Sequence, residues 1–239
     1  MIQTEGIFVG GSAISAPIIG EDFNWSGGDG TYQVLDDGGG NWRIKFLSSG
    51  TFTPLKNMVI DVFLVGGGGG AGSSYCGEGG AGYTTTVRSV VLTANTAYSI
   101  VVGAAGTNGN PSSAGGETTA FTASAAGGKN TSNGTSSSKR PGGTGGSGGA
   151  GYVSPVATTT GGTDGGDGTS SATTGGKGQG TTTREFGETD GDLYASGGGS
   201  NLTATVANSG NGGKYSPTTS SIAAADGIVV IRQHKEVAV

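Results

Sequence analysis

The sequence predicts an all-β protein: an antiparallel β-sandwich with almost no α-helix, into which a bundle of polyglycine-II helices and polar loops is inserted. Glycine contributes 54 of the 239 residues, and each glycine costs about 1 kcal/mol relative to alanine inside an α-helix. The apolar residues gather in short runs rich in β-branched and aromatic side chains, which are typical of strands. Between the last of these runs and the others, glycine recurs in triplets over a long stretch.

The β-sandwich is expected to comprise residues 42–103 together with 222–232. Turn residues separate its first apolar runs, which are WRIKFL, MVIDVFLV, YTTTVRSVVL and AYSIVV. The closing run, IVVIR at 228–232, lies far along the chain and would be a poor strand on its own. We therefore expect the chain to return and close the same sandwich, which makes residues 104–221 an insertion.

Two segments flank the sandwich. Residues 1–41 carry scattered apolar pairs among Gly, Ser and Asp, and we expect an extra strand or a docking arm there. Their start has neither a basic region nor the long apolar stretch of a signal peptide or membrane span, so no membrane insertion is expected. Residues 233–239 are expected to form a solvated tail.

The insertion repeats Gly-Gly-X, and three residues is the period of the polyproline-II helix. This helix makes no internal hydrogen bonds, so a packed copy must pair its N–H and C=O groups with neighbouring copies. Only glycine permits so close an approach on every side. The alternative is a flexible Gly/Ser linker. We expect glycine helices at Gly142, Gly143, Gly145, Gly146, Gly148 and Gly149, and an all-glycine helix in the centre of the bundle at Gly66, Gly67, Gly68, Gly69 and Gly70.

Catalytic chemistry is not expected. The chain has one cysteine and one histidine, too few for a metal cluster, and the histidine, His234, falls in the tail beyond the last strand. Neither Gly-Lys pair has the Ser or Thr that a phosphate-binding loop requires. We therefore expect no enzyme activity and no cofactor. A net charge of −5 and a pI near 4.7 argue against a nucleic-acid partner.

Two groups of carboxylates could supply oxygen ligands to calcium. Asp164 and Asp167 lie in GGTDGGDG, which is weakly similar to a calcium-binding nonapeptide repeat, and Glu188, Asp190 and Asp192 lie in GETDGD. The repeat occurs once, whereas such repeats work as arrays. Solvated turn carboxylates are therefore the favoured interpretation, and no metal site is predicted.

Ligand binding is expected at the loops between the glycine helices. Aromatic and arginine side chains give contact area at low entropic cost, and they are common anchors for protein or sugar ligands. The same aromatic residues could instead cap the glycine bundle and cover its edges. The candidate binding residues are Tyr75, Lys139, Arg140, Tyr152, Arg184, Phe186, Tyr194 and Tyr215.

Several motifs together resemble a known family. The runs FLVGGGGGAG, YTTTVRSVVL, SIVVGAAG, GQGTTTREFG and DGIVVIR resemble the glycine-rich domain of bacteriophage and prophage tail proteins. The resemblance covers about residues 42–232. The same plan is similar to the glycine-rich extracellular region of anaplastic lymphoma kinase, and the packed glycine helices are similar to the distal adhesins of T-even-like tail fibres.

The resemblance implies a function in host recognition. The chain would be a non-enzymatic adhesin at the tail tip or tail fibre of a virion, and its loops would bind a bacterial cell-surface receptor, either a protein or a polysaccharide. Other phage tail proteins would be its remaining partners. Two alternatives stay open: a purely structural tail-fibre or baseplate subunit that acts as a rigid spacer, and a bacterial surface adhesion domain.

Overall fold

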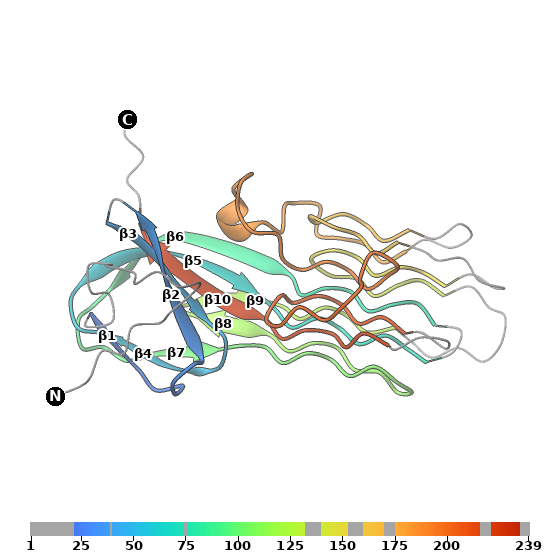
Figure 1. Ribbon diagram of the computed structural model, residues 1–239, viewed down its shortest axis with the longest axis horizontal. Coiled ribbons are helices and arrows are strands. Elements are labelled where there is room, and N and C mark those ends of the chain that lie inside the picture. Colours follow the sequence, from blue (N-terminus) through green and yellow to red (C-terminus); the bar gives the residue numbers. More distant parts are fainter. Residues whose placement is uncertain are drawn as a thin grey trace.

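Two antiparallel sheets lie at one end of the molecule, and long glycine-rich segments run side by side away from them (Figure 1). The structure is a computed structural model. It describes residues 22–38, 40–73, 76–131, 140–152, 160–169, 175–215 and 221–234.

Among the described residues each sheet has five strands, which confirms the predicted all-β sandwich. The order in the first sheet is β1 (Phe23–Trp25), β4 (Gly50–Pro54), β7 (Tyr98–Val101), β8 (Thr118–Ala120) and β9 (Ala123–Ala125). The order in the second sheet is β2 (Tyr32–Gly38), β3 (Asn41–Phe46), β10 (Ile228–Gln233), β5 (Met58–Val65) and β6 (Thr84–Leu92).

Strand β10 closes the second sheet, as the isolated apolar run near the end of the sequence predicts. It lies between β3 and β5 and pairs antiparallel with both. Ile231 faces Ile44 on one side and Val62 on the other. All three side chains are fully buried, so the strand that comes last in the sequence lies in the middle of the sheet and of its core.

The core between the sheets is aromatic and aliphatic. Phe46 from the second sheet packs edge-on against Phe52 from the first, with ring centroids 5.6 Å apart. Both rings are completely buried, and burying such a side chain contributes about 1.5–3 kcal/mol. The alternation of WRIKFL directs Ile44 and Phe46 into this core, as its pattern indicates.

The borders of the sandwich differ from the predicted ones at two places. Strands β8 and β9 lie inside residues 104–221, the range assigned to the insertion, yet β8 pairs with β7 and extends the first sheet. Their sequences, TTA and ASA, lack the large apolar side chains that mark the other strands. The described part of residues 1–41 contains β1 and β2, and residues 1–21 lie outside the described residues.

The all-glycine run at 66–70 leaves β5 and enters the middle of the glycine bundle. Its amides donate in turn to three neighbouring segments, so the pattern repeats every third residue. Gly66 and Gly69 donate to the segment at 80–83, Gly67 and Gly70 to the segment at 113–116, and Gly68 to Ala225, with N···O distances of 2.8–3.0 Å.

On the sides of this run where side chains would project, three further segments lie against the glycines. A Cβ built on Gly67 would overlap the carbonyl of Ala104, and one on Gly68 would overlap the carbonyl of Asn211. A Cβ on Gly69 would overlap Lys129 in the same way. The run therefore has backbone neighbours all round, which is the central position that its composition predicts.

The triplet glycines at 142–149 also hydrogen-bond within the bundle, but they do not form one continuous helix. The chain bends at 145–147, and Gly149 N donates to Gly143 O at 2.8 Å. Residues before and after the bend therefore run antiparallel as two short passes. The uniform Gly-Gly-X repeat gives no sign of this bend, because the turn and the helix use the same residues.

Candidate functional site

We call the end of the bundle away from the two sheets the distal end, marked by Gly72, Thr131, Arg140 and Tyr152. Thr131 Oγ1 accepts a hydrogen bond from Gly72 N at 2.8 Å and donates to Gly77 O at 2.8 Å. Arg140 and Tyr152 exchange both backbone hydrogen bonds, at 3.4 and 2.8 Å. Buried threonine and paired backbone thus hold the last described residues of several segments together.

Arg140 is a basic side chain at this end, and it is partly buried. Its Nε is shielded from solvent and has no hydrogen-bond partner among the described residues. An arginine carries five N–H donors in a planar fork, which suits carboxylates and other paired oxygens. Arg140 is therefore the described group of the distal end that is best suited to bind an oxygen-rich ligand.

Glu78 places a carboxyl group beside the distal end. Its Oε2 accepts a hydrogen bond of 2.6 Å from Tyr215 N, and its own amide donates to Ala150 O at 2.8 Å. Burial raises the pKa of Glu78 to about 7, although the bond from Tyr215 and the charge of Lys214 act in the opposite direction. This carboxyl group therefore changes charge near neutral pH.

The distal end brings together three of the sequence-predicted binding residues. Tyr152 pairs with Arg140, and Tyr215 is connected to both through Glu78 and Ala150, which precedes Tyr152 by two residues. Two other candidates, Tyr75 and Lys139, lie outside the described residues.

Two of the remaining candidates, Phe186 and Tyr194, lie against the outer face of the second sheet. Phe186 is 3% exposed and Tyr194 is 8% exposed. Their rings lie 6.0 and 5.6 Å from the ring of Phe63 on β5. The expectation that they contact a receptor therefore does not fit the structure, in which they cover the sheet with apolar surface, the alternative that the sequence left open.

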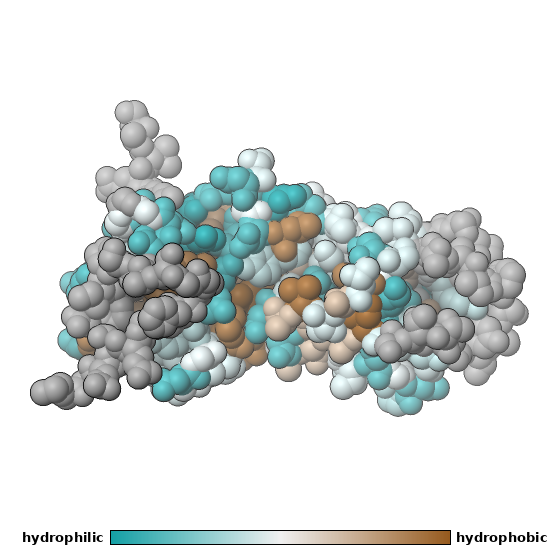
Figure 2. Space-filling view, in the orientation of Figure 1, coloured by the Kyte–Doolittle hydropathy of each residue, from teal (hydrophilic) through white to brown (hydrophobic). Residues whose placement is uncertain are grey.

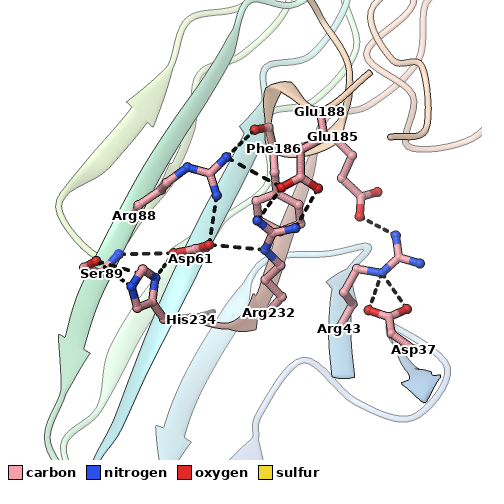
Figure 3. Close-up of polar contacts among 10 residues, drawn as sticks. All are labelled: Asp37, Arg43, Asp61, Arg88, Ser89, Glu185, Phe186, Glu188, Arg232 and His234. Carbon is pink, nitrogen blue, oxygen red and sulfur yellow. Dashed lines mark hydrogen bonds and ion pairs between the residues drawn. The ribbon is translucent and has the colours of Figure 1, made fainter. Parts of the chain in front are cut away.

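A short 3-10 turn, η2 (Glu185–Gly187), holds this segment on the sheet (Figure 3). Glu185 is 1% exposed and forms ion pairs with Arg43 and Lys45 of β3. Tyr194 donates a hydrogen bond to the same carboxylate at 3.2 Å. Burial raises the pKa of Tyr194 to about 12, so its hydroxyl stays protonated and can donate. We call residues 182–194 the strap.

Arg184 lies at the start of the strap and pairs with a carboxylate of the bundle. Its Nε donates to Asp164 Oδ2 at 3.2 Å. A hydrogen bond from Thr182 is the main cause that lowers the pKa of Asp164, and the charge of Arg184 adds to it. Asp167 accepts a hydrogen bond from Gly178 N at 2.6 Å. These two carboxylates therefore fix the position of the segment that precedes the strap and of its first residues.

No three His, Cys, Asp or Glu side chains among the described residues group as metal ligands would.

Asp61 on β5 connects the second sheet to the strap through Arg232. It is 1% exposed, and its Oδ2 accepts hydrogen bonds from Arg88 at 3.0 Å and from Arg232 at 3.2 Å (Figure 3). Arg232 also forms a two-pronged pair with Glu188 of the strap, at 2.7 and 2.8 Å. Burial alone would raise the pKa of Asp61, but hydrogen bonds from His234, from a backbone amide and from Arg232 outweigh it, so the pKa is lowered.

His234 is not in a solvated tail, which corrects the expectation from the sequence. Its amide continues the sheet by donating to Val59 O at 3.0 Å, and its Nδ1 lies 2.6 Å from Asp61 Oδ1. Ser89 Oγ lies 3.1 Å from Nε2 and 3.5 Å from Nδ1. The hydroxyl thus faces the ring between its two nitrogens, whereas the serine of a hydrolase triad lies in line with one of them. We therefore interpret the contact as structural.

The sequence analysis does not identify Asp61 or Glu78 as buried carboxylates, although the burial of Asp61 could be recognised from its position in the sequence. Asp61 is the single charged residue in the apolar run MVIDVFLV. A carboxylate in a strand covered on both sides requires a buried cationic partner, and Arg232 in the closing strand is the natural one. Glu78 has no such signal, because its burial depends on how distant glycine segments pack.

These features define a class: a β-sandwich that carries a bundle of polyglycine-II helices and presents polar residues at the far end of the bundle. The chain belongs to the glycine-rich domain family, whose model matches residues 47–234. Comparison with curated proteins finds none that is similar. In the described part of the chain, no helix is long and apolar enough to span a membrane.

Proposed function

We propose that this protein is a non-enzymatic adhesin at the tail tip or tail fibre of a bacteriophage or prophage particle. In this role the distal end binds a receptor on the bacterial surface, a protein or a polysaccharide, and the sandwich end faces the other tail proteins. The family match names the domain and not the particle, so the proposal depends on the geometry of the chain.

One observation supports the proposal most: the distal end is presented by a scaffold that is held by backbone hydrogen bonds. Because six neighbouring segments surround the run at 66–70, the scaffold does not depend on the identity of the outward side chains. The residues between the helices can therefore change without loss of the fold, which suits a surface that must follow a changing receptor.

Binding of the purified protein to intact host cells tests the proposal. We expect exchange of residues 152–160 and 214–221 for those of a relative with another host to change which cells are bound. Arg140→Ala should weaken binding, whereas Asp29→Ala, an exposed charge change in the β1–β2 turn, should not. Unchanged binding after both exchanges and after Arg140→Ala would show that the distal end is not the receptor site.

The second candidate function is a rigid spacer in the tail. The same hydrogen-bonded bundle favours it, because a spacer needs stiffness and no ligand. The two functions are separated by the cell-binding assay itself: a spacer is incorporated into particles and binds no cells in isolation.

A further inference from the structure

Arg140 differs from the other arginines of the chain, because it has no carboxylate partner among the described residues. The sequence contains five arginines, and all of them are described. Four form ion pairs with Asp or Glu: Arg43, Arg88, Arg184 and Arg232. The Nε of Arg140 is shielded from solvent and has no hydrogen-bond partner in the described ranges. A partly buried cation without a partner is a position where an anion from outside the chain can bind.

Negative charge is absent from the sequence around Arg140. No Asp or Glu occurs between Glu117 and Asp164, although the whole chain has a net charge of −5. Glu78 is the carboxyl group described beside the distal end, and the charge that acts on it is that of Lys214, not that of Arg140. An anionic ligand can therefore take the place that a carboxylate of the chain occupies at the other arginines.

The shielded Nε determines how a ligand can reach this guanidinium. Because Nε is closed to solvent, the two terminal amino groups are the donors that a ligand can contact. Together they present two parallel N–H bonds, which match the two oxygens of one carboxylate. Phosphate groups carry more charge and are commonly bound by clusters of arginines. A single guanidinium in this position therefore favours a carboxylate.

The described surface of the distal end is polar. The large apolar side chains that are well exposed in the described part of the chain belong instead to the sandwich, the strap and residues 200–208: Leu55, Val59, Val91, Val101, Leu193 and Val206. In Figure 2 the coloured atoms toward the distal end, on the right, are mostly white and teal. Protein partners usually bury an apolar and aromatic centre, whereas sugars present hydroxyl groups. The polar surface therefore favours a saccharide.

We propose that the receptor bound at the distal end is an acidic polysaccharide, and that the guanidinium of Arg140 pairs with a carboxylate of one of its sugars. A neutral polysaccharide binds more weakly, because it leaves the guanidinium without a charged partner. The bacterial surface as the source of the ligand rests on the proposed function, but the pairing itself can be tested on the protein alone.

An NMR titration of the full chain with a simple acidic sugar tests the pairing. We expect D-glucuronate at millimolar concentration to shift the Nε–H signal of Arg140, and D-glucose to leave it unchanged. The signals of the four paired arginines are internal controls and should not move, because carboxylates of the chain already bind them. Arg140→Lys removes the signal and so identifies it.

Three results of this titration would overturn the proposal. The first is no shift with glucuronate, and the second is an equal shift with glucose. The third is a larger shift with inorganic phosphate than with glucuronate, which would assign the site to phosphate groups.

Polysaccharide extracted from a strain that binds the protein gives a second test. Reduction of its carboxyl groups to alcohols should weaken binding about tenfold, the cost of one charged hydrogen-bonded pair, whereas removal of its phosphate groups should not. Arg140→Gln should lose the same factor on the native polymer and nothing on the reduced one. Lys177→Gln is the matched control, because it removes one exposed positive charge from the same half of the chain.

The outcomes separate this inference from the proposed function. Equal binding of the native and the reduced polymer would overturn the inference, as would equal losses in Arg140→Gln and Lys177→Gln. Loss of cell binding after protease treatment, but not after carboxyl reduction, would mean that the receptor is a protein and would also overturn it. A chain that binds no cells and still shows the selective shift with glucuronate would contradict the proposed function and leave the pairing intact.

Discussion

At the scale of single residues, the bundle depends on glycine positions, where the absence of a side chain lets neighbouring backbones approach. Five consecutive glycines place backbone against backbone in every direction, so the hydrogen bonds of the bundle are available only while no Cβ separates the segments. Each such bond contributes about 0.5–1.5 kcal/mol net. The interior is thus held by polar contacts of the main chain, whereas the sandwich is held by apolar side chains.

One added methyl group at the centre of the bundle should be severely destabilising. We expect Gly68→Ala to lower the free energy of unfolding by more than about 3 kcal/mol, because its Cβ would overlap the carbonyl of Asn211 and the backbone cannot rotate away. Ala104→Ser, which adds one atom to an exposed side chain, is the control and should change stability by less than about 0.5 kcal/mol. Chemical denaturation measures both. Equal stability of the two variants would contradict the packed bundle.

The carboxyl group of Glu78 gives the bundle a pH dependence of its own. Its pKa is raised to about 7 from an ordinary value of 4.5, so the folded state holds the proton more tightly than the unfolded state. Its contribution to stability is therefore fully present below about pH 4.5 and is lost as the pH rises through 7.

Replacing this group should remove that dependence. We expect Glu78→Gln to stabilise the protein by about 1–2 kcal/mol at pH 8 and to have little effect at pH 4, because the amide oxygen can still accept the hydrogen bond from Tyr215. Unfolding curves of both proteins at the two pH values measure the difference. A stabilisation of the same size at pH 4 would show that the charge is not the cause.

At the scale of elements, the strap fastens the bundle onto the outer face of the second sheet. Phe186 packs against Phe63, and the guanidinium of Arg232 lies 4.1 Å from the centre of the Phe186 ring. Around this apolar contact, Glu185 and Glu188 pair with arginines of the sheet. The strap therefore couples two halves of the molecule that are otherwise joined through the ends of the strands.

Truncating the strap's anchor should loosen this coupling. We expect Phe186→Ala to cost about 3–5 kcal/mol and to make the strap the first site of cleavage in limited proteolysis. Leu193→Ala removes an apolar side chain of the same segment that is 42% exposed, so it should leave both properties almost unchanged. If Phe186→Ala behaves like Leu193→Ala, the strap does not hold the two parts together.

The ion pairs between the second sheet and the strap should make the stability of the protein fall at acid pH. The pKa values of Asp61 and Asp192 are lowered, so their contribution is present above the ordinary carboxyl pKa near 4 and is lost as the pH falls below it. Asp61→Asn should be less stable at pH 7, because the buried Arg232 loses one of its two carboxylate partners and keeps only Glu188.

The same variant should lose less stability than the parent between pH 5 and pH 2.5. Thermal unfolding at several pH values measures this, and Asp29→Asn, an exposed carboxylate, is the control. An unchanged acid response in Asp61→Asn would assign the sensitivity to other groups.

At the scale of the whole molecule, the sequence predicts the features that have a local signature. The closing strand is recognisable because IVVIR needs a sheet to bury it, and the central glycine run because five glycines in a row fit only a crowded backbone site. Features that depend on long-range docking are not recognisable. The burial of Phe186 requires Phe63 on a distant strand, and the short strands β8 and β9 have almost no apolar residues of their own.

The candidate site was predictable to a similar degree. Aromatic and arginine residues in polar stretches are visible in the sequence, and Arg140, Tyr152 and Tyr215 do lie at one end of the bundle. The sequence does not separate them from Phe186 and Tyr194, which have the same chemistry but face a sheet. Only the path of the strap decides which aromatics are available to a ligand.

The glycine-rich half is a folded body held by hydrogen bonds of its backbone. Hydrogen exchange of the amides at 66–70, followed by NMR, tests it most directly. We predict that these amides exchange as slowly as those of β5 and β10, because all five glycines are buried and each donates to a backbone carbonyl. Exchange at the rate of an unstructured chain would contradict it, and would make the glycine-rich half a linker.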